Sequence, residues 1–90
     1  MRLAARISGT GSAFPAQRLT NQELVASFFA QDPPLNEQWI LKRTGITERR
    51  ISNPKEPSES NSSLGARAAL KALQMAGRKP EDLDQILYAT

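Results

Sequence analysis

The stretch DQILYAT, at residues 84–90, constrains the fold of this chain more than any other. Its apolar run from Ile86 to Ala89 is typical of a β-strand that is buried on both faces of a sheet. A strand of that kind needs neighbouring strands at its edges and helices above and below the sheet. The fold therefore depends on which other elements the chain can place around it.

A second strand is predicted near the start of the chain. Residues 3–9, LAARISG, alternate apolar side chains with others and lead into a turn that contains Gly9 and Gly11. Paired glycines after a strand also occur in phosphate-binding loops, but the dinucleotide fingerprint requires a third small residue where this chain has Phe14 and Pro15. We therefore expect the two glycines to serve a tight turn of the backbone.

Two helices are predicted between these strands. Thr20 followed by Glu23 is a helix-start signal, and the apolar positions that follow predict a helix over about 21–30. A second helix is predicted over 64–77, LGARAALKALQMAG, whose alanines permit close approach to a sheet. Gly77 suits the left-handed cap that ends such a helix.

The segments on either side of the second helix are expected to be short connections. Residues 52–63 contain two prolines and five serines, which predicts a mobile surface loop. Pro80 with the two acidic residues after it predicts a further short helical turn before the last strand.

The predicted elements combine into an α/β fold with one βαβ unit. Its strands, at about 3–9 and 84–90, would be parallel neighbours joined by a right-handed crossover through the helices at about 21–30 and 64–77. Two strands with helices on one side leave the other face and both edges of the sheet uncovered. We therefore expect residues 1–90 to be the opening part of a larger α/β domain.

Composition excludes several classes of function. The chain has neither Cys nor His, which excludes disulfides, thiolate or imidazole metal sites, and a Cys-His or Ser-His catalytic pair within these residues. No apolar run approaches the roughly 20 residues that span a bilayer, so we expect a cytoplasmic protein without a membrane segment. The net charge of +3 is low for a protein that binds duplex nucleic acid.

The stretch QWILKRTGITERRIS, residues 38–52, contains the only tryptophan of the chain. Arg43 lies four residues after Trp39, and Arg49 and Arg50 follow a glycine turn. From the residues alone three interpretations stay open: a packed tryptophan with solvated charges around it, a nucleic-acid patch, or a platform for a phosphorylated cofactor.

Arg49 and Arg50 have a simpler interpretation than ligand binding. They alternate along a segment that reads as extended, so their side chains should point to opposite faces. We expect one of them to pair with Glu48 or Glu37 and the other to be solvated.

The order of these motifs resembles β-ketoacyl-acyl carrier protein synthase III, the initiating condensing enzyme of type II fatty acid synthesis in the thiolase-like superfamily. The resemblance runs nearly end to end and concerns the opening segment of that enzyme. It rests on five stretches in the right order: ISGTGSAFP, LTNQEL, WILKRTGITERRI, SSLGARAALKALQMAG and EDLDQILYAT.

The resemblance implies a subunit several times longer than this chain, built from two similar βαβαβαββ halves in five layers and usually homodimeric. It implies a decarboxylating condensation, in which an acyl group passes from acyl-CoA to a Cys and then joins malonyl carrier protein with the help of a His and an Asn. All three catalytic residues would lie beyond Thr90. No catalytic residue is therefore assigned within the chain, and the chain alone is expected to be inactive.

Two residues correspond to the ligand site of that family. By resemblance Trp39 is the platform on which the adenine of CoA stacks, and Arg43 is the arginine near the CoA phosphates. Acyl-CoA would be a substrate, with no permanently bound cofactor and no metal, and acyl carrier protein would be the second partner.

The chain departs from the family pattern around this site. Glu37-Gln38 stand directly before Trp39, Leu35 replaces a hydroxyl residue, and the stretch AQDPPL at 30–35 lengthens the connection. These changes lie at the CoA entrance and leave open whether a carrier-bound thioester is the donor. Two other functions are weighed: a noncatalytic partner subunit of the same fold, and a small basic nucleic-acid-binding domain.

Overall fold

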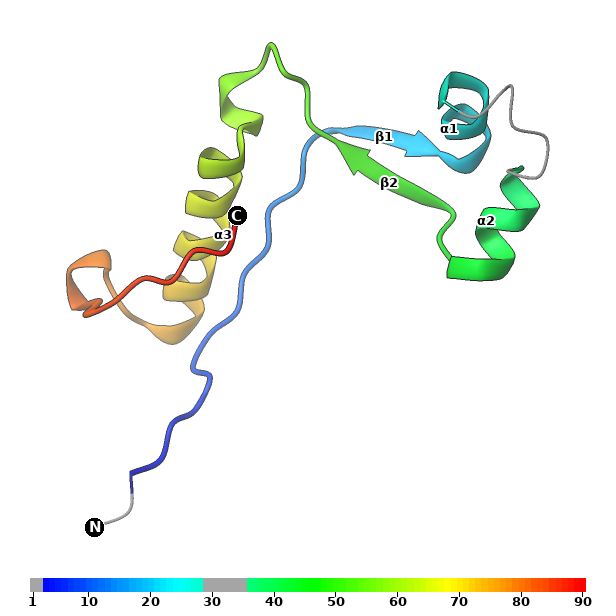
Figure 1. The fold of residues 1–90 in the computed structure, drawn as a ribbon. Helices are drawn as coiled ribbons and strands as arrows, with labels where there is room; N and C mark the ends of the chain where they lie inside the picture. Colours follow the sequence, from blue (N-terminus) through cyan, green and yellow to red (C-terminus); the bar gives the residue numbers. More distant parts are fainter. Residues whose placement is uncertain (1–2, 29–35) are drawn as a thin grey trace. The chain divides into compact units, whose positions relative to one another are not determined.

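The computed structural model describes residues 3–28 and 36–90. The chain divides into two compact units, one formed by residues 15–53 and the other by residues 1–14 together with 54–90 (Figure 1). Each unit has its own helices, and each is described by itself.

The unit of residues 15–53 is built on a two-stranded antiparallel ladder. Strand β1 (Gln17–Thr20) pairs with β2 (Glu48–Ile51) so that Leu19 faces Arg49 across the ladder. Helix α1 (Asn21–Phe28) follows β1 directly, and helix α2 (Glu37–Thr44) precedes β2. This ladder was not predicted, because it joins two four-residue segments from distant parts of the sequence.

The start of α1 follows the predicted capping signal. The Thr20 hydroxyl accepts a hydrogen bond from the backbone N–H of Glu23 at 3.2 Å and donates one to the Glu23 carboxylate at 3.0 Å. These bonds satisfy groups that a helix leaves unpaired at its first turn. The predicted helix over about 21–30 is thus confirmed up to Phe28, and its last two positions lie outside the described residues.

Helix α3 (Asn61–Ala76) begins earlier than predicted. The Ser60 hydroxyl accepts from the backbone N–H of Ser63 at 3.2 Å, so the helix starts at Asn61, three residues before the expected start at 64. A 3₁₀ turn, η1 (Pro57–Glu59), precedes the helix, so the prediction of a loop over 52–63 is wrong in its second half. Proline and serine are common in loops, but they also suit the first turn and the cap of a helix.

The C-terminal end of α3 agrees with the prediction. Gly77 caps the helix with φ at 66°, in the left-handed region that favours glycine. A short turn, η2 (Pro80–Asp82), follows at the predicted place.

The stretches over 3–9 and 84–90 are not strands, and the expected parallel pair is absent from the described residues. The C-terminal stretch lies against α3 instead, and the N-terminal stretch reaches α3 at Gly9 (Figure 1). The backbone N–H of Thr10 reaches the Met75 sulfur at 3.4 Å, and the Tyr88 hydroxyl donates to the Asn61 carbonyl at 2.7 Å. The sequence predicted strands here, but a strand also needs a partner for its backbone groups, and neither stretch has one among the described residues.

Gly9 and Gly11 allow the stretch before β1 to lie directly on α3. A Cβ atom at Gly9 would collide with the backbone of Ala72, and one at Gly11 would collide with the backbone of Ala68 and Ala72. Neither glycine has a positive φ, so the predicted tight turn is wrong. Close approach of two backbones is the reason for glycine at both positions. The alanines of this helix were expected to permit close approach to a sheet; they lie instead against a stretch that is not a strand.

Large apolar side chains stay exposed on the same unit. The exposed fractions are 92% for Leu3, 85% for Ile7, 75% for Ile86 and 86% for Leu87. Among the described residues only Leu19 and Ile40 are buried apolar side chains, and both belong to the other unit. The described residues therefore leave these apolar side chains without cover.

Candidate functional site: an aromatic and basic helix

The two residues assigned to ligand binding lie on α2. Its start is fixed by Asn36, whose side-chain oxygen accepts from the backbone N–H of Trp39 at 2.8 Å. Its end is fixed by Gly45, which has φ at 71° and donates its N–H to the Leu41 carbonyl at 2.8 Å. The caps limit the helix to two turns, with Trp39 in the first and Arg43 in the second.

Trp39 and Arg43 form a stacked pair. They are four residues apart and therefore project from the same side of the helix. The guanidinium carbon of Arg43 lies 5.1 Å from the centroid of the Trp39 ring, within the range of a cation–π contact. Trp39 keeps 38% of its surface exposed, while the next residue, Ile40, is buried. Ile40 thus anchors the helix, and the described residues leave Trp39 only partly covered.

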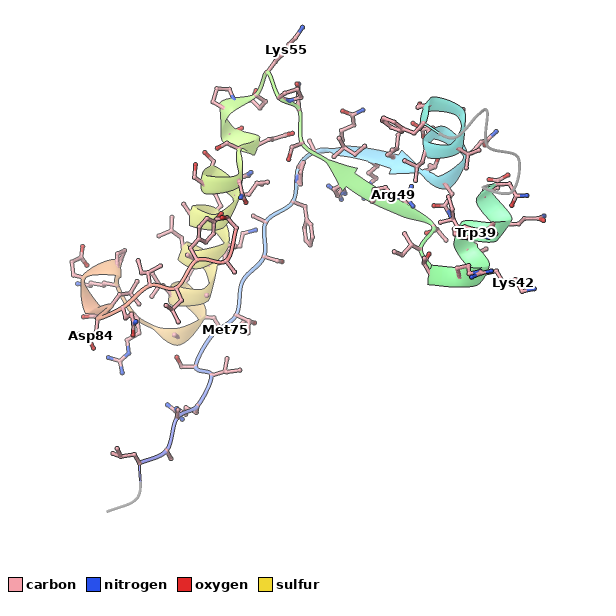
Figure 2. All side chains as sticks on the ribbon, viewed as in Figure 1. Trp39, Lys42, Arg49, Lys55, Met75 and Asp84 are labelled. Carbon is pink, nitrogen blue, oxygen red and sulfur yellow. The ribbon has the colours of Figure 1, made fainter. Side chains whose placement is uncertain are left out.

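The other basic side chains of this stretch are directed elsewhere. Arg49 donates to the side-chain oxygen of Asn21 at 2.5 Å, and Arg50 donates to the Pro15 carbonyl at 2.8 Å. Their predicted alternation is confirmed by their place in β2. The predicted pairing with Glu48 or Glu37 is wrong, and Glu48 forms an ion pair with Arg18 at 3.5 Å instead. Figure 2 shows Arg49 on β2 and Trp39 on α2.

Asn21 was missed in the sequence. It is 6% exposed and is the buried polar residue of the part that the structure describes. Its side-chain nitrogen donates to the Ile46 carbonyl at 2.6 Å, and its backbone N–H donates to the Thr47 carbonyl at 3.1 Å. The available signal was weak: a polar side chain directly after a helix cap, and an arginine that shares one face of a short strand with Ile51.

An open pocket of about 410 Å³ lies beside α2 in the same unit. Its lining comes from the end of β1, from α1, from α2 and from the connection to β2: Thr20, Asn21, Gln22, Glu37, Gln38, Leu41 and Thr47. Neither Trp39 nor Arg43 lines it, so the stacked pair is a surface feature and not the wall of this pocket.

Other kinds of site find no support in the described residues. They contain no group of three acidic, Cys or His side chains that could hold a metal ion. None of their helices has the length and apolar character needed to cross a membrane. The departures noted at 30–35 lie outside the described residues.

Comparison with known proteins confirms the resemblance drawn from the motifs. The chain is 45% identical over 89 residues to the β-ketoacyl-[acyl-carrier-protein] synthase III of Caldanaerobacter subterraneus, covering 99% of this chain and 24% of that protein. It is 46% identical over 87 residues to the synthase III of Microcystis aeruginosa, covering 97% of this chain and 24% of that protein. The synthase III of Sphingopyxis alaskensis is 42% identical over 90 residues, covering 100% of this chain and 26% of that protein.

The fold is similar to part of a solved structure. The crystal structure of 3-oxoacyl-[acyl-carrier-protein] synthase III from Aquifex aeolicus superposes with a TM-score of 0.67 at 36% identity, over 87% of this chain and 22% of that one. The expected α/β, thiolase-like fold class is thereby confirmed, although the two predicted strands are not formed. The chain spans about a quarter of the length of the curated relatives that it matches. No family model matches it.

Proposed function

We propose that the chain is part of a synthase III-like acyltransferase and forms one side of its CoA entrance. The reaction is the decarboxylating condensation of an acyl-CoA with malonyl carrier protein, in fatty acid or related polyketide-type biosynthesis. Acyl-CoA and acyl carrier protein are its partners, and the enzyme acts as a cytoplasmic homodimer. The catalytic Cys, His and Asn lie outside these 90 residues.

The stacked pair on α2 is the observation that carries this proposal. A guanidinium lies over the ring of a partly exposed indole, and we infer that a nucleotide base stacks on the other face of that ring. The guanidinium stands where a phosphate of the same nucleotide could form charge-assisted hydrogen bonds. An aromatic ring with a cation beside it therefore suits a ligand that combines a base with phosphates, as CoA does.

The directions of the basic side chains favour a small ligand over a nucleic acid. A nucleic-acid surface presents several cations along one face. Here Arg49 is turned toward Asn21 and Arg50 toward the Pro15 carbonyl, which leaves Lys42 and Arg43 as the basic side chains that α2 presents. One ring with one cation over it suits a single nucleotide better than a long nucleic acid.

The experiment compares CoA binding by variants of the complete protein, meaning the polypeptide that contains these 90 residues with any that accompany them. Trp39→Ala should raise the dissociation constant for CoA roughly 5- to 150-fold, because stacking on a base contributes about 1–3 kcal/mol. Arg43→Ala should weaken binding at about 0.05 M salt and less so at about 0.5 M salt, because salt screens an exposed charge pair. Calorimetry measures both constants.

Lys42→Ala is the matched control, since it removes the same charge from the neighbouring position of α2 and leaves the stacked pair intact. It should change CoA affinity less than Arg43→Ala does. Alkylation of the nucleophilic thiol should proceed at the normal rate in all three variants. If Trp39→Ala and Arg43→Ala both bind CoA as the parent does, the platform assignment is wrong.

A further inference from the structure

Asn21, which is buried, and Arg49, which is half-buried, form a polar link between the start of α1 and the connection that follows α2. The side-chain oxygen of Asn21 accepts from Arg49, and its nitrogen donates to the Ile46 carbonyl at 2.6 Å. Arginine can only donate and a carbonyl can only accept, so these two partners fix the orientation of the Asn21 amide. Arg49 also donates to the Leu19 carbonyl at 3.4 Å, which holds the guanidinium against β1.

The link continues into the helix that carries the stacked pair. The backbone N–H of Ile46 donates to the Thr44 hydroxyl at 3.1 Å, and that hydroxyl donates to the Ile40 carbonyl at 2.7 Å. Asn21 therefore holds Ile46, Ile46 holds Thr44, and Thr44 is bonded to the preceding turn. Arg43 is the residue directly before Thr44.

The backbone N–H of Asn21 also donates to the Thr47 carbonyl at 3.1 Å, so Asn21 ties the connection between α2 and β2 to the body of the unit through both its side chain and its backbone. Gly45 has open space where a Cβ atom would lie, and Ile46 is 46% exposed. Packing around these two residues is thus slight. The orientation of the last turn of α2 depends on hydrogen bonds to Asn21 and its neighbours, and these are directional in a way that apolar contacts are not.

We propose that Asn21 and Arg49 are positioning residues for the nucleotide platform: they hold the last turn of α2 so that Arg43 stays over Trp39. This inference rests on the proposed function, because it concerns the same CoA entrance. The link touches neither the nucleotide nor the reacting thioester. It acts on binding through Arg43 and Trp39 alone.

The test compares two substrates of the complete protein, acyl-CoA and the corresponding acyl-pantetheine, which lacks the nucleotide. Asn21→Ala should raise KM for acyl-CoA about tenfold, the equivalent of about 1.4 kcal/mol, and leave kcat within about twofold. Kinetics with acyl-pantetheine should be unchanged, because that substrate makes no contact with the platform. A loss of fold stability alone would affect both substrates alike.

Arg50→Ala is the matched control, since it removes an arginine from the next position of β2 on the opposite face. It should behave as the parent with both substrates. Arg49→Lys keeps the charge but cannot reproduce the fixed fork of donors, and it should show the same selective rise in KM as Asn21→Ala. Arg49→Lys carries the test if Asn21→Ala does not fold.

The outcomes separate this inference from the proposed function. Suppose that Trp39→Ala raises KM for acyl-CoA alone, while Asn21→Ala and Arg49→Lys raise KM for both substrates equally or for neither. The platform then stands and the positioning role is overturned. If Trp39→Ala is not selective either, or the protein acts on neither substrate, the proposed function fails and the inference fails with it.

Discussion

Replacing Gly11 by alanine tests the close packing of the N-terminal stretch on α3. The added Cβ would lie 2.7 Å from the Ala72 nitrogen and 2.8 Å from the Lys71 Cβ, and would also collide with the Ala68 carbonyl. These atoms belong to a helix backbone or stand directly on it, so they cannot rotate away. The stretch would have to move outward by about 1 Å, enough to lose a quarter to a half of each contact energy.

Two effects of this substitution oppose each other. Overpacking of this kind costs about 1–3 kcal/mol. Because Gly11 does not need a positive φ, alanine also stiffens the unfolded chain, which stabilises the fold by about 0.4–1 kcal/mol. The steric cost is the larger, and we expect the free energy of unfolding to fall by about 1–2 kcal/mol. The midpoint of urea unfolding of the complete protein measures this change.

Gly45 is the matched control, because it has open space around it but a φ of 71°. Asparagine tolerates that conformation better than alanine does. At Gly45 the asparagine variant should therefore be more stable than the alanine variant, and at Gly11 the order should be reversed because the larger side chain collides more. A neutral or stabilising effect of Gly11→Ala would refute the close approach.

Two further predictions concern the 90-residue chain on its own. It should associate or be partly unfolded, because Leu3, Ile7 and Leu87 are exposed and each loses the roughly 1.5–3 kcal/mol that burial would contribute to stability. The total stability of a domain is only about 5–15 kcal/mol. A monodisperse monomer in sedimentation, with a sharp thermal transition, would contradict this. It should also form no acyl-enzyme with labelled acyl-CoA, because it has no thiol and no His to activate a hydroxyl; stable label on this chain would disprove that.

Features with local causes could be predicted from the sequence. The cap at Thr20, the left-handed cap at Gly77 and the turn at Pro80 each depend on a few neighbouring residues, and the structure has all three. The four-residue spacing of Trp39 and Arg43 was visible in the sequence, but helix α2, which brings the two side chains together, was not predicted.

Features that depend on distant partners could not be predicted. The pairing of β1 with β2 and the bond between Arg49 and Asn21, 28 residues apart, leave no pattern in either segment alone. The alternation at 3–9 suggested a strand, but a strand also requires a neighbour, and here Gly9 lies on α3 instead. The glycines were assigned to a turn because close approach to a helix leaves the same residue type in the sequence.

The location of the acyl group on the complete protein tests the central claim most directly. The protein is incubated with acyl-CoA labelled in its acyl group, without malonyl carrier protein, and the label is located by digestion and mass spectrometry. The account predicts one thioester on a Cys outside these 90 residues, which is converted to a β-ketoacyl product when malonyl carrier protein is added. Two results would contradict it. One is label on a Ser or Thr within the 90 residues. The other is the absence of label in a protein whose CoA binding depends on Trp39, which would indicate a noncatalytic subunit of the same fold.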